Sequence, residues 1–202
     1  MFLKSPPALV LASTSRYRQQ LLARVHDSFQ CAAPGVDETR LQQEGGIALV
    51  GRLALAKARA VAAQYPEAYV IGSDQAASLP DGAGGETLLG KPGTEARCIE
   101  QLRRCSGRTL AFLTAVAVVR KCDDCVIEFV DTTRVTFRLL DEATIARYVA
   151  RESPIDCAGG FKSEGLGISL CESIDSADPS ALIGLPLIRL CAVLRRVGFQ
   201  IP

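Results

Sequence analysis

The sequence contains a single histidine, His26, and no tryptophan. One histidine excludes a zinc protease motif of the HExxH type and any metal site built from several histidines. A Ser-His-Asp triad would have to use His26 itself. The 23 lysines and arginines nearly balance the 22 aspartates and glutamates, so the formal net charge is only +1. We therefore expect no broad basic surface for a nucleic-acid polymer, whose binding requires many neutralised phosphates.

Long apolar runs are absent as well. No stretch approaches the roughly 18 apolar residues of a membrane-spanning helix. The N-terminal stretch MFLKSPPALVLAS is interrupted by Pro6 and Pro7, and its apolar part is too short for the core of a signal peptide. These features predict a cytoplasmic protein without a membrane segment.

The 202 residues are 48% hydrophobic and 22% charged, which is typical of a globular protein of one medium domain or two tightly joined lobes. A chain of this length does not need disulfides, so we expect most of its eight cysteines to be buried thiols. Cys122 and Cys125 have the CxxC spacing of half a zinc site or a redox pair. No second such pair completes a tetrahedral site, and the alternating apolar residues on both sides predict a hairpin turn.

Hydrophobic periodicity predicts alternating strands and helices, and hence an α/β fold with a mixed sheet. Strands are expected at residues 8–12, 68–72, 108–119, 126–139 and 168–174. Helices are expected at residues 16–25, 47–63, 94–105, 141–150 and 185–197. Residues 78–90 have the pattern of a hairpin with a glycine-rich turn.

Two phosphate-binding motifs are excluded. Residues 85–91, GETLLGK, match the glycine and lysine spacing of a P-loop, but Pro92 stands where a magnesium-binding serine or threonine is required. The glycines between residues 159 and 167 do not assemble a GxGxxG motif, so a Rossmann site has no support.

Short polar segments follow the apolar runs, where α/β proteins place ligand-binding loops. They are STSRYR at 13–18, Ser73-Asp74-Gln75, Gly90-Lys91-Pro92 and DCAGGFKSEGLG at 156–167, with Val36-Asp37-Glu38 as a fifth candidate. Together they supply hydroxyls, cations and carboxylates, the mixture that a polyphosphate with a divalent cation requires. Taken singly, each has a simpler interpretation: a serine that caps a helix, a solvated lysine, or an aspartate in a turn.

These segments resemble, in the same order, the motifs of the Maf family of nucleoside triphosphate pyrophosphatases. The matching strings are LASTSRYRQQLL, VDE, LALAKA, IGSDQ, LGKP, FKSEGLG and IGLPLI, from about Leu9 to Leu194. The resemblance implies one Maf-like domain over residues 1–202, with the two-lobed α/β fold of the Maf and inosine-triphosphatase type. That fold has an elongated mixed sheet and a central cleft, and it commonly forms a homodimer.

The resemblance also implies the reaction and the residues that carry it. A nucleoside triphosphate is cleaved between its α and β phosphates with Mg²⁺ or Mn²⁺, which gives the monophosphate and pyrophosphate. Asp74 is the expected general base, and Glu38, with Asp74, is the candidate metal ligand. The residues expected to bind the polyphosphate are Ser13, Arg18, Lys57, Lys91 and Lys162.

Three positions bear on the nucleobase: Tyr17, Gln75 and Glu164. The family branch that acts on dTTP and UTP typically has Arg, Thr and Gln there, whereas the 7-methyl-GTP branch has Trp, Gln and Glu. An aromatic face and a carboxylate suit the positive charge of 7-methylguanine, so 7-methyl-GTP is the expected substrate. The alternatives are dTTP, UTP or another modified nucleotide, and a non-catalytic nucleotide-binding regulator of septum formation.

Two positions depart from the family pattern. Arg16 replaces the usual proline, and Gln19 replaces the second arginine of a pair. We therefore expect a looser turn and weaker phosphate binding, unless Arg16 supplies the missing charge.

Overall fold

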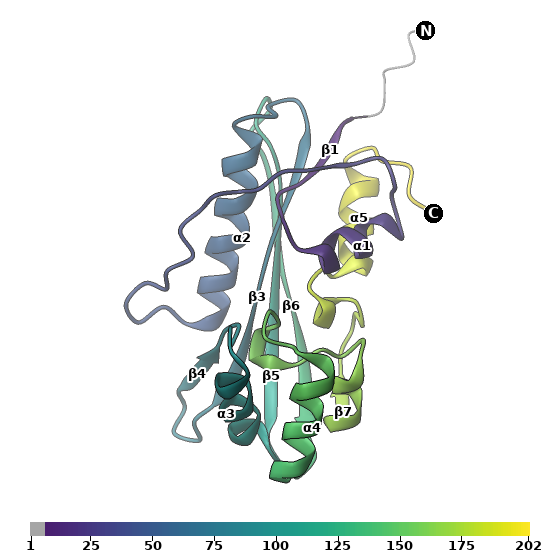
Figure 1. Ribbon diagram of the computed structural model, residues 1–202. Helices are drawn as coiled ribbons and strands as arrows, with labels where there is room; N and C mark the ends of the chain where they lie inside the picture. Colours follow the sequence, from purple (N-terminus) through teal and green to yellow (C-terminus); the bar gives the residue numbers. More distant parts are fainter. Residues whose placement is uncertain (1–6) are drawn as a thin grey trace, which may run out of the picture. The chain divides into compact units, whose positions relative to one another are not determined.

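The structure is a computed structural model that describes residues 7–202, and within these residues seven strands form one mixed sheet (Figure 1). The strand order is β2-β1-β3-β5-β6-β7, with β4 paired to β3. β1 runs parallel to β2 and β3, while β4 is antiparallel to β3 and β7 to β6. The strands are β1 (Leu9–Leu11), β2 (Gln30–Cys31), β3 (Tyr69–Pro80), β4 (Glu86–Leu89), β5 (Thr109–Arg120), β6 (Cys125–Phe137) and β7 (Cys171–Asp175).

Five α-helices complete this part of the chain, and each overlaps a helix that the sequence predicts. They are α1 (Arg16–Ala23), α2 (Gly46–Ala62), α3 (Glu95–Cys105), α4 (Glu142–Glu152) and α5 (Leu187–Arg196). Ser15, Thr94 and Asp141 cap α1, α3 and α4, because each side chain accepts a backbone N–H from the first turn. The expected α/β fold with a mixed sheet is confirmed. In these residues no helix is long and apolar enough to span a membrane.

Two predicted strands differ from the structure. The strand expected to stop before Ser73-Asp74-Gln75 continues through these residues to Pro80, because Ala76, Ala77 and Leu79 restore a buried pattern beyond them. The strand expected from Ile168 begins only at Cys171, since residues 166–170 form a short 3₁₀ helix. The 78–90 hairpin is confirmed as the β3–β4 pair.

The chain forms two compact units, each assembled from separate stretches of sequence. The first unit comprises residues up to Asp74 together with Thr114–Asp131 and Gly184–Pro202. The second unit comprises Gln75–Leu113 and Thr132–Ile183. Strands β3, β5 and β6 contribute residues to both units.

The second unit has its own hydrophobic core, in which Phe161 is the central aromatic residue. Its ring lies 5.6 Å from that of Phe112 and 5.1 Å from that of Phe137, measured between ring centroids. Buried residues of α3 and α4, such as Leu102 and Ile145, belong to the same cluster. Phe161 is the first residue of the FKSEGLG segment, so this packing fixes where that segment begins.

In the first unit, α2 packs directly against β3 at Gly72. A Cβ atom at Gly72 would lie only 2.2 Å from the Ala54 carbonyl oxygen and 2.6 Å from the Ala58 nitrogen. The helix presents the small residues Ala54 and Ala58 to this contact, and both are buried. The close approach brings side chains of α2 within reach of those that follow Gly72 on the strand.

Gly72→Ala should destabilise the protein by about 1–3 kcal/mol, because the added methyl group would overlap backbone atoms that cannot move independently. Gly51→Ala is the matched control, since Gly51 lies on the same helix and a Cβ atom there would meet nothing within 4 Å. It should leave stability unchanged or raise it by up to about 1 kcal/mol through helix propensity. Urea unfolding measures both variants, and equal midpoints for the two would contradict the close packing.

Candidate active site

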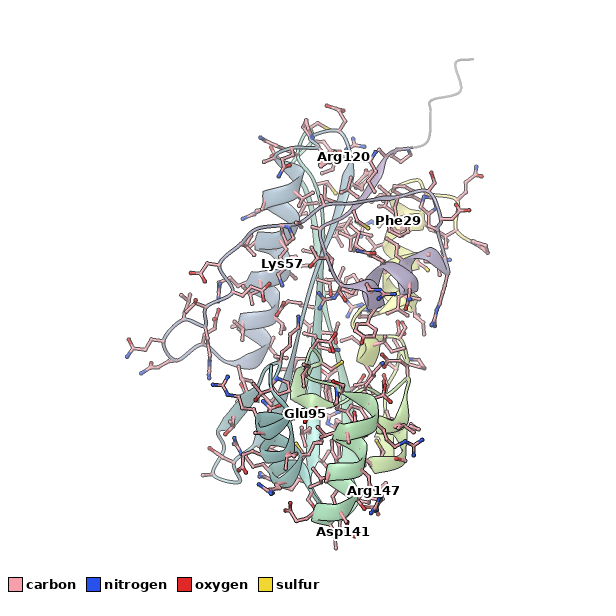
Figure 2. The ribbon with its side chains drawn as sticks, in the orientation of Figure 1. Phe29, Lys57, Glu95, Arg120, Asp141 and Arg147 are labelled. Atoms are coloured by element: carbon pink, nitrogen blue, oxygen red, sulfur yellow. The ribbon has the colours of Figure 1, made fainter. Side chains whose placement is uncertain are left out.

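The ammonium group of Lys57 lies between two carboxylates in the first unit. Its Nζ atom is 2.6 Å from Oδ1 of Asp74 and 2.7 Å from Oε1 of Glu38. Figure 2 labels Lys57, which lies on α2. Its side chain contacts β3 through the hydrogen bond to Asp74. Lys57 is 5% exposed and Asp74 8%, whereas the Glu38 side chain is 58% exposed. Three residues that the sequence names separately are therefore brought together.

Strand alternation explains how Asp74 reaches this position. Successive side chains of a strand point to opposite faces, so Asp74 shares a face with Gly72, which packs on α2. Asp74 thus meets Lys57 from within β3, and not from a loop at the end of a strand as the sequence predicts. Ser73 lies on the other face, where its hydroxyl donates to the Gly184 carbonyl oxygen at 3.0 Å.

The surroundings of Asp74 have opposite effects on its pKa. Burial raises the pKa of its carboxyl group above the ordinary value, and the charge and hydrogen bond of Lys57, followed by the charge of Arg18, lower it. The charge of Glu38 adds a smaller upward effect. The net pKa is raised, so Asp74 is a stronger base than an exposed aspartate while remaining paired with a cation.

The loop that carries Glu38 is anchored to α2. The Asp37 carboxylate accepts the Thr39 backbone N–H at 2.9 Å, and Arg52 of α2 donates to the Thr39 carbonyl oxygen at 3.1 Å. Arg52 also pairs with Glu44 at 2.6 Å and lowers the pKa of that carboxyl group to about 2. Two residues of α2 therefore hold this loop: Arg52 binds its backbone, and Lys57 binds the carboxylate of Glu38. Sequence reasoning missed the role of Arg52, which resembles an ordinary surface charge.

Arg18 projects from α1, and its position is fixed by a backbone carbonyl. Its Nε atom donates to the Gly184 carbonyl oxygen at 3.0 Å, the same oxygen that accepts from Ser73. Gly184 has a φ angle of +123°, which favours glycine. Burial lowers the pKa of Arg18, and the charges of Asp74 and Glu38 raise it. Ser73 and Gly184 thus support a predicted phosphate-binding residue. They fall in the strings IGSDQ and IGLPLI, but neither was named from the sequence as a site residue.

The remaining predicted residues of the first unit lie at the start of α1. Ser13 is buried, and its hydroxyl oxygen accepts the Ser15 backbone N–H at 3.1 Å. Tyr17 is half-buried and Arg16 is exposed. Gln19, which replaces the second arginine of the family pattern, donates to the Ser13 carbonyl oxygen at 3.5 Å. It therefore supports the turn instead of supplying a charge.

The second unit brings two other polar segments together. The Gly90 carbonyl oxygen accepts the Gly159 N–H at 3.1 Å, and the Ile155 carbonyl oxygen accepts the Gly93 N–H at 2.9 Å. The loop with Lys91, which is exposed, is thereby held beside the DCAGGFKSEGLG segment. That segment contains Lys162, whose Nζ atom is 2.9 Å from Oε1 of Glu152.

The last two predicted specificity residues also lie in the second unit. Glu164 is exposed, and the Ser163 hydroxyl donates to its carboxylate at 3.5 Å. Gln75 follows Asp74 on β3, and its amide nitrogen donates to the Ala181 and Leu182 carbonyl oxygens at 3.0 and 3.1 Å. Gln75 therefore holds the chain just before Gly184, and its part in base selection stays a prediction.

The donor atoms present fit a magnesium or manganese ion that is shared with a polyphosphate. Glu38 and Asp74 offer hard carboxylate oxygens beside one ammonium group, and Mg²⁺ characteristically takes one or two carboxylates together with substrate phosphates. Among residues 7–202, no group of three or more His, Cys, Asp or Glu side chains could hold a metal ion by itself. A resident zinc ion at Cys122 and Cys125 is thus unsupported.

The cysteine predictions hold in part. All eight cysteines are free, and Cys122 lies in the turn that joins β5 and β6, which confirms a hairpin at KCDDC. Three cysteines are buried, three are half-buried, and Cys31 and Cys122 are exposed. The expectation that most are buried is therefore wrong, because several lie on strands and turns near the surface.

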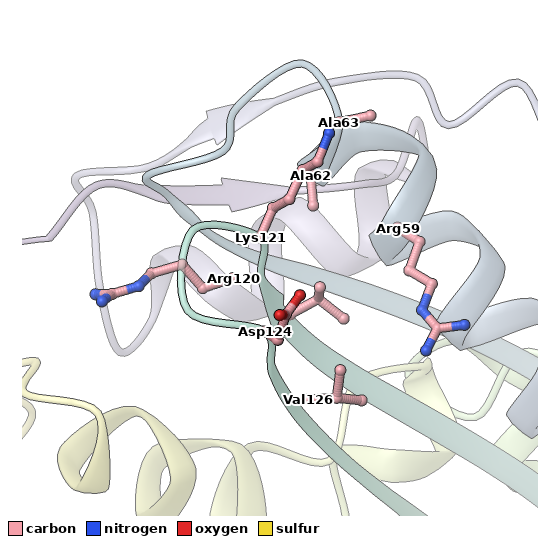
Figure 3. Close-up of a pocket in the computed structure, with 8 residues that line it drawn as sticks. Arg59, Ala62, Ala63, Arg120, Lys121, Asp124 and Val126 are labelled. Atoms are coloured by element: carbon pink, nitrogen blue, oxygen red, sulfur yellow. The ribbon is translucent and has the colours of Figure 1, made fainter.

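The same hairpin borders a pocket of about 350 Å³ in the first unit (Figure 3). The last turn of α2 contributes Arg59 and Ala62, and the residue after the helix, Ala63, lies beside them. The hairpin contributes the other walls, including Lys121 and Asp124. None of the site residues named from the sequence lines this pocket. It is therefore a feature separate from the Lys57 cluster.

Fold and site together define an α/β protein with a buried lysine held between carboxylates and an anchored arginine nearby. The family model described as Maf-like protein matches residues 8–197, and the chain belongs to this family. Three relatives, each named 7-methyl-GTP pyrophosphatase, come from Polaromonas sp., Alkalilimnicola ehrlichii and Nitrosococcus oceani. Their identities are 54%, 52% and 48%, and the matches cover 94%, 96% and 98% of this chain and 84%, 96% and 96% of theirs.

Among solved structures, the Ham1 protein of Staphylococcus aureus aligns with a TM-score of 0.47 and 17% identity. The alignment covers 64% of this chain and 71% of the Ham1 chain.

Lys57→Met should cost about 3–5 kcal/mol of stability near pH 7, because it leaves the buried Asp74 carboxylate without its main cation. The raised pKa of Asp74 rises further in this variant, so acidification protonates the carboxyl group and reduces the deficit. The double variant Lys57→Met/Asp74→Asn should regain much of the loss at pH 7.

Urea unfolding at pH 7 and pH 5 measures the wild type, the single variant and the double variant. An equal deficit in the single and double variants at both pH values would mean that the ion pair contributes nothing beyond packing.

Proposed function

We propose that this chain is a nucleoside triphosphate pyrophosphatase that hydrolyses 7-methyl-GTP to 7-methyl-GMP and pyrophosphate. The observation that carries the proposal is the Asp74–Lys57–Glu38 cluster, in which a buried carboxylate, a cation and an exposed carboxylate meet at one point. Three relatives that cover nearly the whole chain bear this activity in their names. The proposal assigns a step of the reaction to each group.

Asp74 is the general base in this proposal. Its carboxylate accepts a proton from a water molecule, and the water oxygen bonds to the α phosphorus. The bond from the α phosphorus to the oxygen that bridges it to the β phosphate then breaks. Pyrophosphate leaves with the electron pair of that bond. The raised pKa of Asp74 favours proton uptake, and Lys57 keeps enough of the group ionised to act.

The cations neutralise the polyphosphate. In the first unit, Arg18 is held by Gly184, and the Lys57 ammonium has three protons, one more than its contacts with the two carboxylates require. In the second unit, Lys91 is exposed and Lys162 is fixed near one end of the FKSEGLG segment. Cations placed before substrate arrives stabilise the developing charge without reorganising during the reaction.

Glu38 and Asp74 would hold the divalent cation. Glu38 is the better candidate, because its exposed side chain can turn from Lys57 toward an ion. When bound, Mg²⁺ or Mn²⁺ withdraws charge from the phosphate oxygens.

Selection of the base is assigned to Tyr17 and Glu164. A half-buried tyrosine offers an aromatic face, and an exposed glutamate offers a negative charge. 7-Methylguanine carries a delocalised positive charge, which both groups attract and which GTP lacks. A cytoplasmic location and a homodimer stay predictions.

The proposal predicts that pyrophosphate is released chiefly from 7-methyl-GTP in a panel that also contains GTP, dTTP, UTP, CTP and ATP with Mg²⁺ or Mn²⁺. Asp74→Asn should lower kcat about 10²- to 10⁴-fold while the protein stays folded. Asp124→Asn is the matched control, since Asp124 is an exposed turn residue of the same unit, and it should keep full activity.

Both pyrophosphate and orthophosphate are scored in this assay. A preference for dTTP and UTP would agree with the proposed mechanism but would refute the assignment of base selection to Tyr17 and Glu164. Near-normal turnover by Asp74→Asn would refute the general base. No turnover of any nucleotide would favour a binding regulator.

A further inference from the structure

Lys162 is anchored at its backbone on both sides. Its N–H donates to the Tyr148 hydroxyl oxygen at 3.0 Å, and its carbonyl oxygen accepts from Gly165 N at 3.3 Å and Gly167 N at 3.1 Å. A Cβ atom at Gly167 would lie 2.3 Å from that carbonyl oxygen, so the turn needs a glycine there. The backbone of Lys162 therefore has little freedom, and only its long side chain remains to be directed.

Glu152 directs that side chain from the last turn of α4. Its Oε1 atom is 2.9 Å from the Lys162 ammonium, and its Oε2 atom accepts the Leu166 N–H at 2.7 Å. The carboxylate lies directly against Gly165, where a Cβ atom would be only 2.5 Å from Oε2. One carboxylate thus holds both the lysine head and the loop that follows it.

Glu152 and Tyr148 are four residues apart on α4, so they lie on the same face of the helix. Tyr148 is buried in the core of the second unit, and the Glu152 side chain is 12% exposed. The hydrogen bond from Lys162 lowers the pKa of Glu152 against the opposing effect of burial, and the Leu166 N–H lowers it further. Glu152 therefore stays ionised at neutral pH, as an ion pair with Lys162 requires.

We infer that Glu152 is a positioning residue for the polyphosphate, which acts by holding the Lys162 ammonium in the orientation that receives phosphate oxygens. The inference rests on the proposed function, because it takes Lys162 as a phosphate ligand. An ammonium group has three protons, so Lys162 can donate to a phosphate while it keeps its bond to Glu152. A lysine held in one orientation before binding loses less side-chain entropy when the nucleotide arrives.

Two other roles for Glu152 lead to different results. If it only braces the loop against α4, its removal weakens binding whether or not Lys162 is present. If it competes with phosphate for the ammonium group, its removal tightens binding. A double-mutant cycle with Lys162 separates these roles from positioning.

The test is titration calorimetry with the α,β-methylene analogue of 7-methyl-GTP, which binds without being cleaved at the bond in question. The variants are Glu152→Gln, Lys162→Met and the double variant. Glu142→Gln is the matched control, because Glu142 lies on the same helix and pairs with Arg103 at 2.7 Å, away from the loop. Unfolding by urea confirms that each variant is folded.

Positioning predicts that Glu152→Gln raises Kd about tenfold, whereas Glu142→Gln changes it by less than about twofold. In the Lys162→Met background, Glu152→Gln should change Kd by less than about twofold, because the group it directs is gone. A full tenfold effect in that background would overturn the inference in favour of a brace. Unchanged or tighter binding by Glu152→Gln would also overturn it.

Turnover of 7-methyl-GTP by the wild type is measured alongside the binding. A wild type that binds the analogue but releases no pyrophosphate refutes the proposed function, and the Kd values still decide the role of Glu152. A wild type that turns over 7-methyl-GTP with Kd unchanged by Glu152→Gln refutes only the positioning role.

Discussion

The buried ammonium group of Lys57 is the constraint on which the first unit depends. An isolated charge that is 5% exposed would be very costly, so Asp74 and Glu38 must approach it, and their approach fixes two other parts of the chain. Asp74 requires β3 to lie close to α2, which Gly72 permits by its lack of a side chain. Glu38 requires an ordered loop, which Arg52 anchors from the same helix.

The same arrangement occurs in both units: a cationic side chain is held by a hydrogen-bond acceptor before any ligand binds. Lys57 is held by carboxylates, Lys162 by Glu152, and Arg18 by the carbonyl oxygen of Gly184. Charged groups that are fixed in this way need little reorganisation when a polyphosphate arrives.

The sequence predicted much of this arrangement through periodicity and short motifs. The helices at Arg16–Ala23 and Gly46–Ala62 follow from apolar spacing. The Ser15 cap of the first helix and the small residues of the second are visible in the sequence. The predicted end of β3 is wrong, because the polar residues at 73–75 have the composition of a loop and their partners are known only in the folded chain. Glu152 was missed for the same reason: near a helix end it resembles a surface charge, and only the folded chain shows Lys162 and Leu166 N beside it.

In the proposed function, Asp74 is a base whose pKa is raised by burial, while Lys57 limits the rise by its positive charge and hydrogen bond. The test is a ¹³C NMR titration of the Asp74 carboxyl group in the free protein, compared with the acid limb of kcat/KM for 7-methyl-GTP, which reports the pKa of the free enzyme. The carboxyl group should titrate above its ordinary value of 3.8, and kcat/KM should rise with pH through the same midpoint. A carboxyl group that titrates at or below 3.8, or an acid limb of kcat/KM unrelated to its titration, would rule out Asp74 as a base of raised pKa.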